Sequence, residues 1–161
     1  MVFHALAKNA LFLCAGAVIC KTGCTRVKEL RGMGKRMPAV MVCFALASLS
    51  LVGIPPAGGF LAKWHLAVGA MRAEAGVFAW LGPAVLMVSA LLTAGYLFPV
   101  IVEGFFPGED WRKTDQSEDG RLSVSAFMGV PLAVLGISLL VLGALGNPVF
   151  ELLRGIASAM V

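Results

Sequence analysis

The sequence predicts an all-α protein, a polytopic bundle of transmembrane helices with four or five membrane segments, one of them discontinuous. Its residues are 59% hydrophobic, its mean hydropathy is +0.89, and only 14% of its residues are charged, whereas soluble domains carry about a quarter charged residues. Apolar runs long enough for the lipid core, about 20 residues each, alternate with short polar connections. One of these runs is interrupted by glycines and prolines, and a lysine follows the interruption. These features exclude an ordinary soluble domain.

The first apolar run, residues 1–20, is rich in Ala, Leu and Phe and is expected to end as a helix near Gly23. His4 and Lys8 are four residues apart in this run, so they share one face of the predicted helix. Ionisable side chains inside a membrane segment are costly and usually face a polar path. His4 and Lys8 are therefore candidate functional residues.

A strongly basic connection, residues 21–37, follows the first run. By the positive-inside rule, this concentration of Lys and Arg predicts a cytoplasmic loop. Six of the thirteen basic residues lie here: Lys21, Arg26, Lys28, Arg31, Lys35 and Arg36. No stripe of bases with interleaved aromatic side chains accompanies them, so the net charge of +4 does not indicate a nucleic-acid partner.

The next two apolar runs, 38–54 and 59–76, flank a break at about residues 53–59. Prolines and glycines do not continue a regular helix, and the backbone groups that they free at membrane depth need protein or water partners. The residues of the break are Gly53, Pro55, Pro56, Gly58 and Gly59. The two runs are either separate crossings, giving five in total, or two halves of one broken crossing, giving four.

Lys63 lies just after this break and is the residue on which the functional interpretation depends most. A charge near mid-bilayer costs about 3 kcal/mol on insertion scales, so we expect Lys63 to face a polar cavity. Burial disfavours the charged form of a lysine, and a buried lysine can therefore release and regain a proton near neutral pH. The less specific interpretation is a lysine that reaches interfacial water with its long side chain.

Two further crossings are predicted, over residues 83–106 and 122–145. Pro99 lies inside the first of them and should kink it. The polar connection between them, residues 107–121, carries three basic and five acidic side chains. Its side of the membrane depends on whether the chain crosses four or five times.

The transmembrane bundle is thus expected to cover residues 1–146. After Asn147-Pro148, residues 147–161 are predicted to form a short amphipathic tail that lies at the membrane interface.

Four strings, in order, make the chain resemble a known family, the proton-translocating antiporter-like membrane subunits. This family occurs in respiratory complex I, in Mrp-type cation/proton antiporters and in membrane-bound hydrogenases. The strings are HALAKNALFLCAG at 4–16, KELRGMGKRMP at 28–38, GIPPAGGFLAK at 53–63 and SALLTAGY at 89–96. The resemblance covers residues 1 to about 106, and beyond residue 121 the chain is similar only in hydrophobicity.

This resemblance implies proton, or cation/proton, translocation by the chain as the C-terminal part of an antiporter-like subunit. It implies that 38–54 and 59–76 are one broken crossing, which favours four crossings. The implied partners are membrane lipid and other membrane subunits of a larger complex, which would supply the helices that precede this part. The implied location is the cell inner (plasma) membrane. The chain shows no catalytic chemistry of its own, although the complex would be a redox-driven translocase if it is of the complex I or hydrogenase type.

By the same resemblance, Lys63 is the terminal proton-transfer residue, and Lys8 with His4 forms an internal relay. His65, Tyr96 and Glu103 are further candidates, each with a simpler interpretation. His65 has no counterpart in the matched motifs, Tyr96 could only satisfy backbone groups, and Glu103 could be an interfacial anchor. No cofactor is expected, because the sequence has neither a glycine-rich phosphate loop nor a cysteine quartet, and no metal site is expected from its four cysteines. The alternative function is a non-transporting membrane fragment or an assembly subunit of such a complex.

Overall fold

A computed structural model describes residues 2–55, 57–72, 76–108, 122, 124–146, 151 and 155. Within these ranges the chain is helical and has no strand, which confirms the predicted all-α class. The elements are α1 (Val2–Thr22), the 3₁₀ turn η1 (Val27–Leu30), α2 (Met33–Arg36), α3 (Pro38–Val52), α4 (Gly58–Arg72), α5 (Val77–Phe105) and α7 (Ala126–Ala144).

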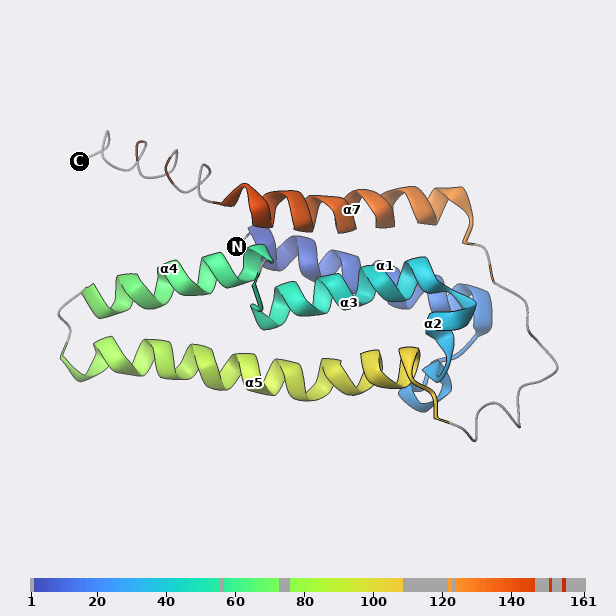
Figure 1. Cartoon of the computed structure of the whole chain (residues 1–161), viewed down its shortest axis with the longest axis horizontal. Coiled ribbons are helices and arrows are strands. Elements are labelled where there is room, and N and C mark those ends of the chain that lie inside the picture. The colour runs from blue at the N-terminus through green and yellow to red at the C-terminus, as the bar shows by residue number, and fades with distance from the viewer. Residues whose placement is uncertain are drawn as a thin grey trace.

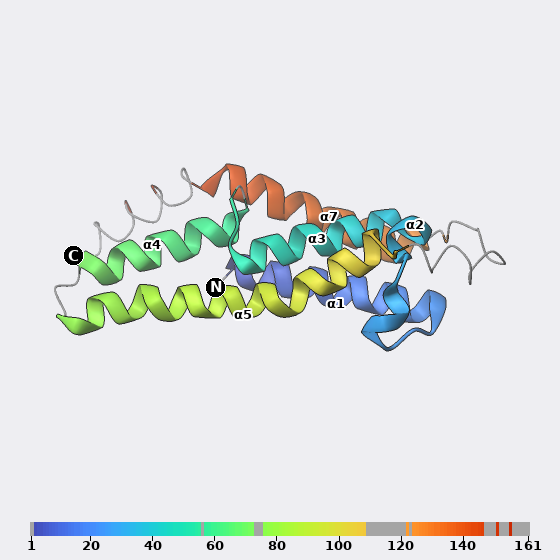
Figure 2. The ribbon, with the colours of Figure 1, turned by 60° about the horizontal axis from the view of Figure 1, so that its bottom comes forward.

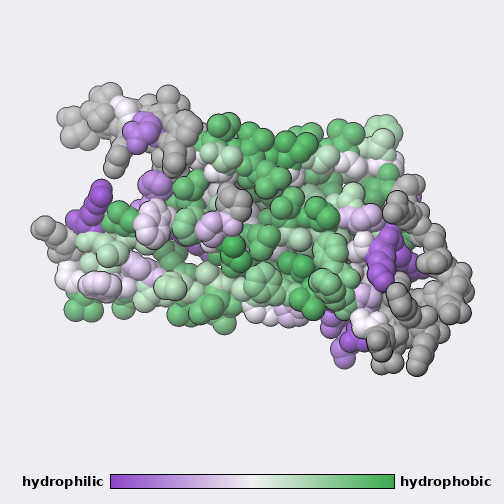
Figure 3. All heavy atoms as spheres, viewed as in Figure 1, coloured by the Kyte–Doolittle hydropathy of each residue, from purple (hydrophilic) through white to green (hydrophobic). Residues whose placement is uncertain are grey.

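Three of the described helices, α1, α5 and α7, are long and apolar enough to cross a membrane, and α3 is a shorter apolar helix. Large hydrophobic side chains remain exposed along them; Leu91 of α5, for example, is 70% exposed. In Figure 3 hydrophobic surface covers the middle of the bundle, and hydrophilic residues gather toward its two ends. Such a surface suits lipid or other membrane helices rather than water.

The helices lie side by side along one axis (Figure 1). α1 packs on α3 and α7, and α5 packs on both α3 and α4. α3 and α4 follow one another in the same direction, whereas α5 returns along the length of both, as the turned view in Figure 2 also shows. At 1.5 Å per residue, two helices of 15 residues span about 45 Å, and the 29 residues of α5 span about 43 Å. This arrangement corresponds to one broken crossing beside a continuous one.

The basic loop is held at the end of the bundle where α5 finishes. The backbone N–H of Gly32 donates to the carbonyl of Glu103 at 3.2 Å, and that of Leu122 donates to the carbonyl of Arg36 at 2.9 Å. The described residues on both sides of the 109–121 connection therefore lie at the same end as the basic loop. This arrangement agrees with four passes rather than five.

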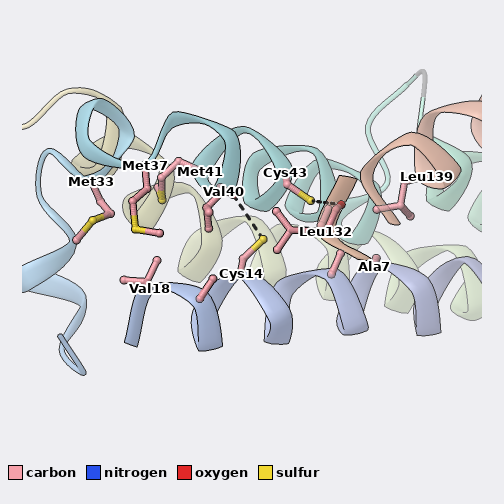
Figure 4. Close-up of a cluster of buried hydrophobic side chains, with 13 residues drawn as sticks. Ala7, Cys14, Val18, Met33, Met37, Val40, Met41, Cys43, Leu132 and Leu139 are labelled. Carbon is pink, nitrogen blue, oxygen red and sulfur yellow. Dashed lines mark hydrogen bonds between the residues drawn. The ribbon is translucent and has the colours of Figure 1, made fainter. Parts of the chain in front are cut away.

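The core lies where α1, α3 and α7 meet (Figure 4), and alanines and cysteines make up nearly half of it. Small side chains let membrane helices approach closely and gain van der Waals contact, because lipid supplies no hydrophobic force between them. Its buried residues on these helices are Ala7, Ala10, Cys14, Ala17 and Val18 of α1, Val40, Met41, Cys43 and Ala47 of α3, and Leu132 and Leu139 of α7. Buried methionines from the basic loop, Met33 and Met37, close one end of this core.

α5 begins at Val77, six residues before the start expected from Gly82-Pro83. A proline has no backbone N–H to donate to the carbonyl one turn back. Helix α5 nevertheless continues through both Pro83 and Pro99. Its packing against α3 and α4 supports it along this length. The predicted tail, residues 147–161, lies outside the described residues except for the isolated positions 151 and 155.

Candidate functional site

The break between α3 and α4 begins with a tight turn at Gly53. Its φ of 87° is in the left-handed region that favours glycine. The backbone N–H groups of Gly53 and Ile54 both donate to the carbonyl of Leu49, at 3.0 and 3.1 Å, which resembles the common glycine-based C-terminal cap. Pro55 lies in the turn that follows, and Pro56, also predicted for the break, is outside the described residues. The chain then resumes as a helix at Gly58.

Lys63 reaches back from α4 to the open end of α3. Its Nζ donates to the carbonyls of Leu51 at 3.1 Å and Val52 at 2.8 Å. These carbonyls belong to the last turn of α3 and have no partner within their helix, and the negative end of the helix dipole adds to the attraction of the ammonium. The broken crossing therefore stabilises a positive charge at the point where its own backbone is interrupted.

Glycines allow the two halves of the break to approach closely. A Cβ on Gly59 would overlap the carbonyl oxygen of Ser50, and a Cβ on Gly58 would overlap the ring of Phe3. The stem of Lys63 lies over Gly53, where an added Cβ would be 3.0 Å from its Cδ. Glycines of the predicted break thus permit the close packing that surrounds Lys63.

A cavity of about 100 Å³ lies at this break and contains both His4 and Lys63 in its lining. The residues around it are Phe3, His4, Ser50, Leu51, Gly59, Ala62 and Lys63. Such a volume can hold several waters, since one water needs only about 10–15 Å³ on this scale. Two predicted proton-transfer residues, from different helices, thus line one chamber.

Lys8 lies in a second, more open groove of about 280 Å³ between α1, α3 and α5. Tyr96 is the other polar side chain that lines this groove. Leu51 lines both the groove and the cavity, so the two spaces adjoin at this residue. The structure therefore divides the predicted set into one pair, His4 and Lys63, and another, Lys8 and Tyr96.

No carboxylate of the described residues lines either space. The described acidic residues are Glu29, Glu103 and Glu151. Glu29 accepts hydrogen bonds from the backbone N–H groups of Thr25 and Arg26 in the basic loop. The described residues that line these two spaces thus include the basic residues His4, Lys63 and Lys8 and no carboxylate.

His65 and Glu103 lie apart from both spaces. His65 is exposed on α4, and its Nδ1 lies 2.9 Å from the carbonyl of Leu61 in the same helix. Glu103 lies near the end of α5, with its Oε1 3.9 Å from Arg31 Nη2. The geometry of Glu103 fits the simpler interpretation, an anchor for the basic loop.

We expect Glu103→Gln to leave ion translocation unchanged and to lower stability by no more than about 1 kcal/mol. The ion pair is long and its two side chains are 56% and 32% exposed, and such pairs contribute little. Vesicle translocation assays and thermal denaturation of the assembled protein would measure both quantities. A large loss of translocation at normal abundance would instead place Glu103 in the path.

Sequence reasoning did not identify Ser50. Ser50 lines the cavity with His4 and Lys63, and its buried hydroxyl has no hydrogen-bond partner among the described residues. The available signal was a polar residue in an apolar run, less than one turn before the Gly53 break. Ser48 has the same signal but a different environment, so sequence alone could not separate the two.

These features define the chain as part of an integral multi-pass membrane protein. They are a bundle of apolar helices, one broken crossing, a lysine at the break and a small cavity beside it. The comparisons identify the family. Residues 1–94 match the family model described as NADH:quinone oxidoreductase/Mrp antiporter, TM. The chain belongs to this family, which confirms the resemblance inferred from the four sequence strings.

Relatives occur in more than one kind of complex. The chain is 41% identical over 155 residues to NADH-quinone oxidoreductase subunit N of Desulforudis audaxviator, covering 92% of the chain and 30% of that protein. It is 32% identical over 148 residues to a subunit of the Na(+)/H(+) antiporter of Alkalihalophilus pseudofirmus, covering 92% and 28%. The structure of the Mrp complex from Dietzia sp. DQ12-45-1b matches with a TM-score of 0.75 at 26% identity, over 93% of this chain and 34% of that one. The chain thus spans about a third of the length of these relatives.

Proposed function

We propose that this chain translocates protons, or exchanges a cation for protons, as the C-terminal part of an antiporter-like subunit in a larger membrane complex. The observation that carries the proposal is the position of Lys63 at the break, donating to two helix-end carbonyls and sharing a cavity with His4. Membership of the family supports the proposal, as do relatives named as subunits of oxidoreductases and antiporters.

The chemistry follows from the two states of the Lys63 side chain. As an ammonium it makes charge-assisted hydrogen bonds to Leu51 and Val52, which are about twice as strong as neutral ones. As an amine it holds these carbonyls less strongly and loses its attraction to the end of α3. Loading a proton therefore tightens the break and releasing one loosens it, which couples the charge of Lys63 to the geometry of the crossing.

His4 is the proton partner of Lys63 across the cavity. A neutral imidazole can accept a proton at one ring nitrogen while donating from the other. Lys8, one turn further along α1, continues the relay into the groove that Tyr96 also lines. The two spaces adjoin at Leu51, so we expect a proton to pass between them either beside this residue or along α1 from Lys8 to His4.

Translocation also requires partner membrane subunits and segments that correspond to the additional length of the relatives. These would supply the proton entry path and the driving force, either redox chemistry or the gradient of a cation such as Na⁺. We place the chain in the cell inner (plasma) membrane with the basic loop 21–37 on the cytoplasmic side. The described ends of the 109–121 connection then lie on that side too.

Replacing Lys8 tests the relay. We expect Lys8→Ala, in the complete complex in membrane vesicles, to lower the proton translocation rate by at least about tenfold, because general acid–base groups typically contribute that much or more. Insertion and abundance should remain normal, since Lys8 is exposed and makes no described hydrogen bond that the fold needs.

Lys21→Ala is the matched control, because Lys21 is a second exposed lysine on α1, in its last turn beside the basic loop. It should translocate normally. Equal rates in the two variants would remove Lys8 from the path and favour the alternative, a non-transporting assembly role for this part of the subunit.

A further inference from the structure

Ser50 carries a buried hydroxyl that the fold leaves without a described partner. The residue is 2% exposed, and no described group hydrogen-bonds to its Oγ. Buried hydroxyls are nearly always paired, and an unpaired one costs about 1–3 kcal/mol. Ser48, two residues earlier on α3, shows the usual solution, because its Oγ donates to the carbonyl of Phe44 at 2.8 Å. The Ser50 hydroxyl therefore does not serve the stability of α3.

The position of Ser50, beside two titratable residues, indicates a functional role. It lines the cavity at the break, together with His4 from α1 and Lys63 from α4. Close packing of Gly59 on the Ser50 carbonyl fixes this part of α3 against the start of α4. Ser50 is thus fixed in the wall of the cavity that His4 and Lys63 also line.

We infer that the Ser50 hydroxyl relays the proton between Lys63 and His4; this inference rests on the proposed function. Two of the three N–H donors of the Lys63 ammonium are used on the carbonyls of Leu51 and Val52. The third can donate to the Ser50 hydroxyl only when the ammonium moves within hydrogen-bond distance of it, because no described residue bonds to that hydroxyl in this structure. A hydroxyl can accept one hydrogen bond while it donates another. Rotation about its C–O bond therefore lets the Ser50 hydroxyl accept from a protonated Lys63 or donate to a neutral one.

The transfer balances without any co-reactant. The Nζ–H bond of Lys63 breaks and its proton bonds to Ser50 Oγ, while the hydroxyl's original proton passes to a neutral ring nitrogen of His4, directly or through cavity water. The products are a neutral lysine, an unchanged serine and an imidazolium. The reverse sequence reloads Lys63.

The test compares Ser50→Ala with Ser48→Ala in the complete complex. Ser50→Ala removes a hydroxyl with no structural partner, so we expect unchanged or higher thermal stability together with translocation at least about tenfold slower. Ser48→Ala removes a paired hydroxyl from the same helix and should translocate normally. The solvent deuterium isotope effect on translocation should change in Ser50→Ala and stay the same in Ser48→Ala, which a purely structural role would not produce.

Lys63→Met in the same assay distinguishes a failure of the Ser50 relay from a failure of the proposed function, proton translocation. If Lys63→Met is inactive while Ser50→Ala translocates at the rate of Ser48→Ala, the relay through Ser50 is wrong and the proposed function stands. If Ser50→Ala loses stability in proportion to its activity, the hydroxyl is structural and the inference is likewise overturned. If Lys63→Met itself translocates normally, the proposed function fails, and the inference fails with it.

Discussion

Gly59→Ala should prevent the two halves of the broken crossing from packing. The added Cβ would overlap the carbonyl oxygen of Ser50, a backbone atom that cannot swing away as a flexible side chain could. Relieving the overlap requires α4 to move relative to α3, at a cost of about 3 kcal/mol or more. We expect a sharp fall in assembled protein, and the molecules that do assemble should translocate poorly because Lys63 no longer reaches Leu51 and Val52.

Gly69→Ala is the matched control for this substitution. Gly69 lies on the same helix, α4, and a Cβ there meets no atom within 4 Å. Alanine in a helix interior is favoured over glycine by about 1 kcal/mol, so this variant should be as stable as the parent or more so. Quantitative immunoblotting of membranes and vesicle assays would measure both variants. Normal assembly and activity of Gly59→Ala would show that the close approach is not required.

Lys63→Met should have the largest effect on function. Methionine has a similar length but can neither hold a proton nor donate to the carbonyls at the end of α3. We expect translocation to fall by at least about 100-fold, whereas stability should fall by only about 1–3 kcal/mol, the cost of leaving buried carbonyls unpaired. Proton uptake by vesicles, normalised to the amount of assembled complex, is the measurement.

Arg72→Met controls for loss of a basic residue from the same helix. Arg72 is exposed in the last turn of α4, far along the helix from the break, and its replacement should leave translocation normal. Comparable activity in Lys63→Met and Arg72→Met would show that no proton needs to bind at residue 63.

The break was predictable from sequence because its causes are local. Gly53 and Pro55 interrupt a helix wherever they occur, and a lysine inside an apolar region demands a partner in any fold. The structure supplies partners that local reasoning could not name, the carbonyls of Leu51 and Val52 on the preceding helix. Those bonds depend on how closely the start of α4 packs against the end of α3, and hence on the packing of Gly59.

The cavity and its serine were not predictable because they arise from three segments far apart in sequence. His4 and Lys8 share a face of α1, as their spacing requires, but they line different spaces, which adjoin at Leu51 of α3. Periodicity along α1 carries no information about this division. Similarly, Ser48 and Ser50 look alike in sequence, but in the structure the Ser48 hydroxyl donates to the carbonyl of Phe44, whereas the Ser50 hydroxyl is buried without a described partner.

The number of passes also depended on long-range geometry. Both halves of the broken crossing are too short to decide from length alone whether each spans the bilayer. The same direction of α3 and α4, and the hydrogen bonds of the basic loop to Glu103 and Leu122, agree with a single broken crossing.

Proton translocation by Lys63→Arg tests most directly whether Lys63 exchanges protons or only caps α3. Arginine keeps the positive charge and the donors that hold the end of the helix, but its guanidinium stays protonated and cannot pass a proton on. In vesicles containing the complete complex, we expect normal assembly with translocation at background level. Near-normal translocation in Lys63→Arg would contradict proton transfer through Lys63 and leave it only the role of a helix cap.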